Sequence, residues 1–249
     1  MPAAPNHQRI LLLGGTADAR MIADALAKMD HVDAELSLAG VLSAPLKMAL
    51  PLRIGGFGGV AGLVRYLKEH KVTTLIDATH PYAAQMSAHA AAACDQAKVN
   101  RLTLWRPPWV PEEDDDWQGF DAWADLINAI PAGARVFMAA GQDGMKALPP
   151  APSFTVLARA LAKPDGLPDY VEMITALPAK TAEQEIALLT DHQISHIICK
   201  NSGGRSSQAK LIAARRLRIP VLMLNRPPPP SEPCFPDAKA LLAGLEWTG

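Results

Sequence analysis

Ile10-Leu11-Leu12-Leu13-Gly14-Gly15-Thr16-Ala17-Asp18-Ala19-Arg20 is the stretch that decides the fold class of this chain. Four apolar residues run into two glycines, and an apolar pattern at helical spacing follows Thr16 and Asp18. This order predicts a buried strand, a tight turn and the start of a helix. In an open parallel sheet such a turn binds nucleotide phosphate, because the helix N-terminus offers N–H groups and glycines allow close approach. The stretch lacks the full G-x-G-x-x-G fingerprint, so a strand–helix turn without a ligand is the alternative.

The same strand-then-helix order recurs along the chain, which predicts an α/β fold with mainly parallel sheets. Buried strands are expected at 34–38, 72–76, 101–105, 136–140, 155–158, 196–199 and 219–224. The second half therefore repeats the βαβ pattern of the first. We predict an N-terminal nucleotide-binding domain over 1–110, a linker over 111–119 and a C-terminal domain over 120–249.

Composition excludes several classes of protein. The chain has 249 residues, of which 49% are hydrophobic and 20% charged, so a packed core is expected. A net charge of −1 argues against a nucleic-acid partner, and no apolar run reaches membrane-spanning length. The N-terminus lacks the layout of a signal peptide. The three cysteines have no metal-binding spacing, so we expect no metal site, a reducing compartment and a cytoplasmic location.

The second predicted strand ends at Ala39-Gly40-Val41 without the acidic residue that often holds the ribose hydroxyls of NAD. This absence favours a 2′-phosphorylated cofactor. The nearby polar candidates for contacting it are Ser37, Ser43, Lys47 and Arg53.

A second glycine cluster, Gly55-Gly56-Phe57-Gly58-Gly59, follows Arg53-Ile54. Four glycines in five positions exceed what a connection needs, which favours a loop that lies against a ligand, with Phe57 covering it. The alternative is a flexible loop in which Phe57 fills a gap in the core.

Polar residues gather after the strand predicted at 72–76, in Asp77-Ala78-Thr79-His80-Pro81-Tyr82-Ala83. Ligands bind at this carboxyl edge of parallel sheets, so we expect Thr79 and His80 to face a substrate or a nicotinamide. A purely structural hydrogen bond is the alternative for His80.

Five consecutive carboxylates at 112–116 lack the glycine and the spacing of a calcium loop, and they predict a solvated linker at the domain boundary. By contrast, Lys200-Asn201-Ser202-Gly203-Gly204-Arg205-Ser206-Ser207 opens directly from a buried strand. Its two cations, hydroxyls and glycines favour binding of a phosphate or carboxylate. A capped turn with solvated cations is the alternative.

Taken together, these motifs resemble the precorrin-6A reductase family of cobalamin biosynthesis. The resemblance covers nearly the whole chain and depends on the order of the motifs more than on any single one. Many members of the family carry an arginine directly after Ser-Leu-Ala-Gly, where this chain has Val41. The matching segments are Leu13-Gly14-Gly15-Thr16, Asp18-Ala19-Arg20, Ser37-Leu38-Ala39-Gly40, Gly55-Gly56-Phe57-Gly58-Gly59, Gly62-Leu63, Asp77-Ala78-Thr79-His80-Pro81-Tyr82-Ala83, Lys200-Asn201-Ser202-Gly203-Gly204, Ala213-Ala214-Arg215, Ile219-Pro220-Val221 and Arg226-Pro227.

The resemblance implies NADPH-dependent reduction of a ring double bond of precorrin-6A to give precorrin-6B. It also implies two Rossmann-like domains with the active site in the cleft between them, and hand-over contacts with neighbouring pathway enzymes. On this interpretation His80 and Lys200 are the candidate catalytic residues. The cofactor-binding candidates are Gly14, Gly15, Thr16, Ser43, Gly56, Phe57, Gly58, Thr79 and His80. The substrate-binding candidates are Lys200, Ser202, Gly203, Gly204 and Arg205.

Two other functions compete with this interpretation. A non-catalytic NADP(H)-sensing regulator would need the glycine loops but not the polar loop of the second half. An NADPH-dependent reductase of small carbonyl compounds would be expected to carry a Tyr-x-x-x-Lys pair. No lysine stands four residues after Tyr66, Tyr82 or Tyr170.

Overall fold

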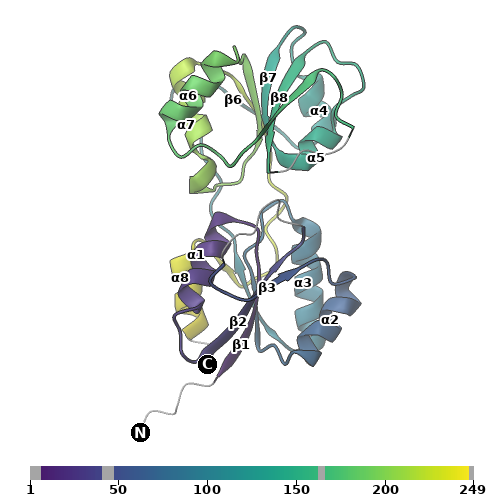
Figure 1. Cartoon of the computed structure of the whole chain (residues 1–249), viewed down its shortest axis with the longest axis vertical. Coiled ribbons are helices and arrows are strands. Elements are labelled where there is room, and N and C mark those ends of the chain that lie inside the picture. The colour runs from purple at the N-terminus through teal and green to yellow at the C-terminus, as the bar shows by residue number, and fades with distance from the viewer. Residues whose placement is uncertain (1–6, 41–47, 162–165, 247–249) are drawn as a thin grey trace. The chain divides into compact units, whose positions relative to one another are not determined.

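A computed structural model of the chain describes residues 7–40, 48–161 and 166–246 and divides into two compact units (Figure 1). The first unit consists of the chain up to Pro107 together with the chain from Pro227 onward. The second unit runs from Pro108 to Arg226. Each unit is built around one six-stranded sheet in which every pair of neighbouring strands is parallel. The predicted class, two Rossmann-like α/β domains, is confirmed.

The first sheet has the strand order β12-β5-β4-β1-β2-β3. Helices α1 and α8 cover one face, and α2 and α3 cover the other (Figure 1). The strands are β1 (Gln8–Leu13), β2 (Val32–Leu38), β3 (Leu52–Ile54), β4 (Thr74–Asp77), β5 (Asn100–Leu104) and β12 (Cys234–Phe235). The helices are α1 (Ala17–Leu26), α2 (Gly59–Glu69), α3 (Ala84–Ala97) and α8 (Ala238–Glu246).

Strand β1 is central because both of its faces are apolar. Leu12 packs into the core under α1 and α8, whereas Leu11 packs into the core under α2 and α3. A strand that is buried on both faces has an almost continuous apolar sequence, as Ile10 to Leu13 does.

The second sheet has the strand order β6-β11-β10-β7-β8-β9. Helices α6 and α7 pack together on one face, and α4 and α5 lie on the other (Figure 1). The strands are β6 (Trp117–Phe120), β7 (Arg135–Ala139), β8 (Thr155–Ala160), β9 (Val171–Thr175), β10 (His196–Lys200) and β11 (Val221–Leu224). The helices are α4 (Trp123–Asn128), α5 (Gly141–Lys146), α6 (Ala182–Asp191), α7 (Ala209–Leu217) and the short 3-10 helix η1 (Arg205–Ser207).

The outermost strand on one side of each sheet comes from an unexpected part of the sequence. Strand β6 follows β5 in the chain but pairs with β11, and β12 follows β11 but pairs with β5. The two sheets thus exchange their sixth strands. The predicted C-terminal domain over 120–249 is therefore wrong at its end, because β12 and α8 return to the first unit.

The predicted acidic linker over 111–119 also needs correction. Strand β6 begins at Trp117, within that range. The carboxylates before it are partly engaged, since Arg215 of α7 contacts Glu112 at 2.6 Å and Asp115 at 3.0 Å, and the Asp115 side chain is fully covered. This charge pairing fixes the start of the second unit against α7.

Among the described residues, none of the helices has both the length and the apolar character needed to cross a membrane.

The place of α8 in the first core yields a stability prediction. Leu241 of α8 is fully buried in the cluster that contains Leu12 and Ile22. Leu241→Ala should lower the free energy of unfolding by about 2–5 kcal/mol, because it leaves a cavity in that core. Urea unfolding followed by circular dichroism measures the change, with Lys239→Ala on the exposed side of α8 as the control. Equal stability of the two variants would contradict the placement of α8.

Candidate functional site

The carboxyl edge of the first sheet carries most of the residues predicted to bind a cofactor. In the strand register, Leu13 of β1 pairs with Ser37 of β2 and with Asp77 of β4. Leu38 of β2 pairs with Ile54 of β3. Because all these strands are parallel, the loops that follow β1, β3 and β4 leave the sheet at the same edge.

Hydrogen bonds of the Thr16 cap fix the turn between β1 and α1. Gly15 has a φ of +115°, and a Cβ built on it would meet nothing within 4 Å. Thr16 caps α1, accepting the Ala19 N–H at 3.1 Å on its hydroxyl. The same hydroxyl donates to the Ala78 carbonyl at 2.9 Å, which ties this turn to the loop after β4. The result is an uncovered backbone at a helix N-terminus.

Asp77 organises the loop after β4. The residue is 1% exposed, and its Oδ1 accepts both the Thr79 N–H at 3.1 Å and the Thr79 hydroxyl at 2.7 Å. Within the described part of the chain, its Oδ2 has no hydrogen-bond partner. His80 accepts the Tyr82 N–H on Nδ1 at 3.4 Å, and the two ring centroids lie 5.5 Å apart. Asp77 therefore fixes the orientation of Thr79.

A partly buried ion pair sets the charge at the start of α1. Arg106, just after β5, donates from Nη1 to Oδ2 of Asp18 at 2.5 Å. Burial lowers the pKa of Arg106, and the nearby Asp18 carboxylate opposes this shift. The carboxylate in the first turn of α1 is thus matched by a cation, which leaves the backbone dipole of the helix N-terminus favourable to an anion.

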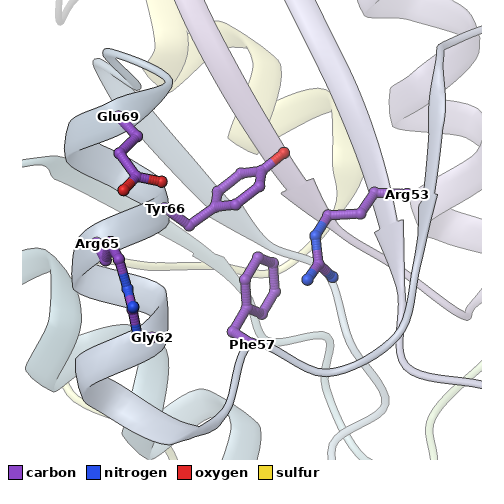
Figure 2. A pocket seen from close by; sticks show the side chains of 6 residues that line it. All are labelled: Arg53, Phe57, Gly62, Arg65, Tyr66 and Glu69. Carbon is purple, nitrogen blue, oxygen red and sulfur yellow. The ribbon is translucent and has the colours of Figure 1, made fainter.

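The glycine loop after β3 packs closely on α2. Gly62 of α2 lies so near to Phe57 that a Cβ on Gly62 would stand 1.6 Å from the Phe57 carbonyl oxygen. The rings of Phe57 and Tyr66 meet edge to face at a centroid distance of 5.1 Å (Figure 2). The Tyr66 hydroxyl donates to Glu35, and burial together with this carboxylate raises the pKa of Tyr66 to about 12. The loop is therefore a fixed part of the edge.

The polar loop after β10 lies at the corresponding carboxyl edge of the second sheet. Lys200 donates from Nζ to Oδ2 of Asp143 at 2.7 Å, and its Nζ lies 6.0 Å from the centroid of the Trp123 ring. The Lys200 side chain is 12% exposed, whereas that of Asp143 is 64% exposed. Ser202 is buried, and its hydroxyl accepts the Gly204 N–H at 3.4 Å. Arg205 is exposed at the start of η1.

Three residues outside this loop anchor it, namely Trp109, Arg226 and Lys210. Asn201 exchanges two hydrogen bonds with the backbone of Trp109, at 2.8 and 3.0 Å. Arg226 donates from Nε to the Asn201 carbonyl at 2.7 Å. Lys210 is 3% exposed, donates to the Ser207 carbonyl at 2.6 Å, and lies 4.8 Å from the centroid of the Trp109 ring. Burial lowers the pKa of Lys210, so its ammonium depends on these contacts.

The structure groups the predicted residues into two sets, one in each unit. The first contains Gly14, Gly15, Thr16, Gly56, Phe57, Gly58, Thr79 and His80 at the edge of the first sheet. The second contains Lys200, Ser202, Gly203, Gly204 and Arg205 in one loop of the second unit. Ser43 lies outside the described residues, so its role stays a prediction.

Sequence reasoning missed several side chains that support these loops. Asp143 had a usable signal, because it follows a buried strand and Gly141 at the carboxyl edge. The partners Trp109 and Lys210 had none, since only the tertiary fold brings Trp109 to Asn201, 92 residues away.

The contact between Gly62 and Phe57 supplies a test of the glycine loop. In an ordinary helix, Gly→Ala raises stability by about 0.5–1 kcal/mol. Gly62→Ala should instead lower the free energy of unfolding by about 1–3 kcal/mol, because the new methyl overlaps the Phe57 carbonyl. Chemical denaturation measures the change in the free energy of unfolding and its sign, with Ala61→Ser at the neighbouring exposed position as the control. A stabilised Gly62→Ala variant would show that the loop does not pack as described.

Comparison with known proteins agrees with this geometry. Residues 9–246 match the family described as precorrin-6x reductase CbiJ/CobK. A precorrin-6A reductase of Rhodobacter capsulatus is 44% identical over 241 residues, covering 95% of this chain and 94% of that protein. The precorrin-6A reductase of Rhodococcus erythropolis is 39% identical, covering 97% of each chain. A solved structure titled CobK precorrin-6A reductase superposes with a TM-score of 0.91 at 39% identity, covering 97% of each chain. The chain therefore belongs to the precorrin-6x reductase family.

Proposed function

We propose that this protein reduces a ring double bond of precorrin-6A with NADPH to give precorrin-6B, in cobalamin biosynthesis. One observation carries the proposal: a member of a reductase family presents three polar or glycine-bearing loops at one edge of a sheet whose strand order is that of dinucleotide-binding folds. Membership of the reductase family supports the reductive chemistry and the substrate. The loops at the carboxyl edge of the first sheet support a nicotinamide cofactor.

The residues at this edge fit such a cofactor. The backbone at Gly15 faces open space, as it also does at Gly56 and Gly58, where an added Cβ would meet nothing within 4 Å. In the proposal, Gly14, Gly15 and Thr16 hold the pyrophosphate at the N-terminus of α1. The loop over 56–58 lies along the cofactor.

The loop after β4 serves the reacting end of the cofactor. The bound nicotinamide supplies a hydride, and the protein supplies orientation and charge. Asp77 holds Thr79 by two hydrogen bonds, so that Thr79 and His80 can be presented to the nicotinamide in a fixed arrangement.

The loop after β10 fits a substrate that carries several carboxylates. Lys200 and Arg205 supply cations, and Ser202, Gly203 and Gly204 supply a hydroxyl and backbone N–H groups. Reduction of the ring also needs a proton. His80 and Lys200 are the two donors that we propose, and protonated Lys200 is stabilised by Asp143 at 2.7 Å.

An anaerobic assay with purified precorrin-6A and NADPH tests the function. Oxidation of NADPH with formation of a product two hydrogen atoms heavier than the substrate is the expected result. Binding of NADPH without oxidation would identify a cofactor-sensing regulator instead. Oxidation with small carbonyl compounds but not with precorrin-6A would identify a different reductase.

The assignment of Lys200 to the substrate gives a sharper test. Lys200→Met keeps most of the length of the side chain and removes its charge. It should lower kcat/KM for precorrin-6A by about 10- to 100-fold, because each charge-assisted hydrogen bond is worth about 1.5–3 kcal/mol. The Kd for NADPH, measured by fluorescence titration, should change by less than about twofold. Lys146→Met on α5, which removes an exposed lysine, is the matched control. An unchanged kcat/KM in Lys200→Met would remove Lys200 from the site.

A further inference from the structure

An arginine of β3, Arg53, lies close to the carboxyl ends of the neighbouring strands β2 and β3. Arg53 lies beside Ser37 in the strand register, one residue before β3 ends. In sheets with this strand order, the end of the second strand lies next to the adenosine ribose of a bound dinucleotide. The described residues at that end, Leu38-Ala39-Gly40, include no acid to hold two free ribose hydroxyls.

The guanidinium of Arg53 is held rigidly by neutral groups. Nη1 donates to the Gly55 carbonyl at 2.5 Å and approaches the Ser37 hydroxyl at 3.4 Å, while Nη2 donates to the Gly56 carbonyl at 2.9 Å. Its central carbon lies 3.9 Å from the centroid of the Phe57 ring. None of the ion pairs formed among the described residues includes Arg53. Its charge is thus oriented without a carboxylate in direct contact.

Arg53 lines a cavity of about 340 Å³ together with Phe57, Gly62, Arg65, Tyr66 and Glu69. Figure 2 shows Glu69 on the far side of Tyr66 from Arg53, so Arg53 is the charged lining residue on its own side of Tyr66. The nearby Glu35 carboxylate accepts the Tyr66 hydroxyl. A volume of this order suits part of a cofactor, and the combination of guanidinium and aromatic rings suits an anion joined to a flat base.

We propose that this cavity binds the phosphorylated ribose and the adenine of NADPH, and that Arg53 binds the 2′-phosphate and so sets the preference for NADPH over NADH. This inference rests on the proposed function. A guanidinium offers two parallel N–H groups to a phosphate, and it also stacks on a flat ring. The contacts with Gly55, Gly56 and Phe57 orient it before the cofactor arrives, so little side-chain freedom is lost on binding.

Cofactor binding by full-length variants tests the proposal. The Kd values for NADPH, NADH, adenosine 2′,5′-bisphosphate and adenosine 5′-monophosphate are measured for the wild type, Arg53→Gln and Arg53→Lys. Lys28→Gln, which removes an exposed positive charge from the loop just after α1, is the matched control. Arg53→Gln should weaken NADPH and the bisphosphate by about 10- to 100-fold, the loss expected for a charge-assisted hydrogen bond.

The two ligands without a 2′-phosphate should bind Arg53→Gln within about threefold of the wild type, since they make no such bond. Arg53→Lys keeps the charge but not the planar fork, so its preference for NADPH should fall between those of the other two proteins. This variant also supplies the answer if Arg53→Gln fails to fold.

Three results would overturn the inference. If the arginine variants keep the wild-type preference for NADPH, another group binds the 2′-phosphate and the proposed function stands. If they lose affinity for all four ligands equally, Arg53 only supports the loop. If the wild type itself binds NADH as tightly as NADPH, the cofactor of the proposed function is wrong as well, although reduction of precorrin-6A with NADH would keep its reaction.

Discussion

Parallel pairing of every strand is the constraint on which the rest of this structure depends. In a parallel sheet all strands end at one edge, so loops that are far apart in the sequence begin side by side. Leu13 and Asp77 are register partners, which is why the turn after β1 and the loop after β4 can share the hydrogen bond from Thr16 to Ala78. The apolar strands carry few polar groups of their own. Polar chemistry is therefore concentrated in the loops.

The strand exchange follows from the same constraint. A parallel sheet with this order has an outer position next to its fifth strand, and any short strand of suitable register can fill it. Strand β12 has only two residues and β6 only four, so neither has a strong pattern of its own. Their place is set by partners, with Arg215 fixing the chain before β6 and Leu241 fixing the chain after β12.

Much of the first edge could be predicted from the sequence because its signals are local. An apolar run followed by glycine and threonine predicts β1, its turn and the start of α1 within ten residues, and the structure confirms each step. At the start of α6, the Thr181 hydroxyl accepts the Gln184 N–H, a cap that also depends only on neighbouring residues. Strand β3, with three residues and no alternation, offered no comparable signal.

The side chains that position the candidate site could not be predicted, because they are paired over long separations. Arg106 meets Asp18 across 88 residues, and Lys200 meets Asp143 across 57. A run of acids or a lone lysine in a sequence does not tell which charges will be neutralised. Only packing decides that Asp115 is covered while Asp143 remains exposed.

The carboxyl edge of the first sheet and the loop after β10 differ in the groups that they offer to a negatively charged ligand. The carboxyl edge of the first sheet offers backbone groups and a helix N-terminus, whose positions are fixed by the fold. The loop after β10 offers Lys200, whose charge is already paired with Asp143. Since the Asp143 side chain is 64% exposed, water can solvate it when a ligand carboxylate takes its place, so the exchange of partners costs little. Lys200 can therefore stay charged and ordered before a ligand arrives and still exchange its partner afterwards.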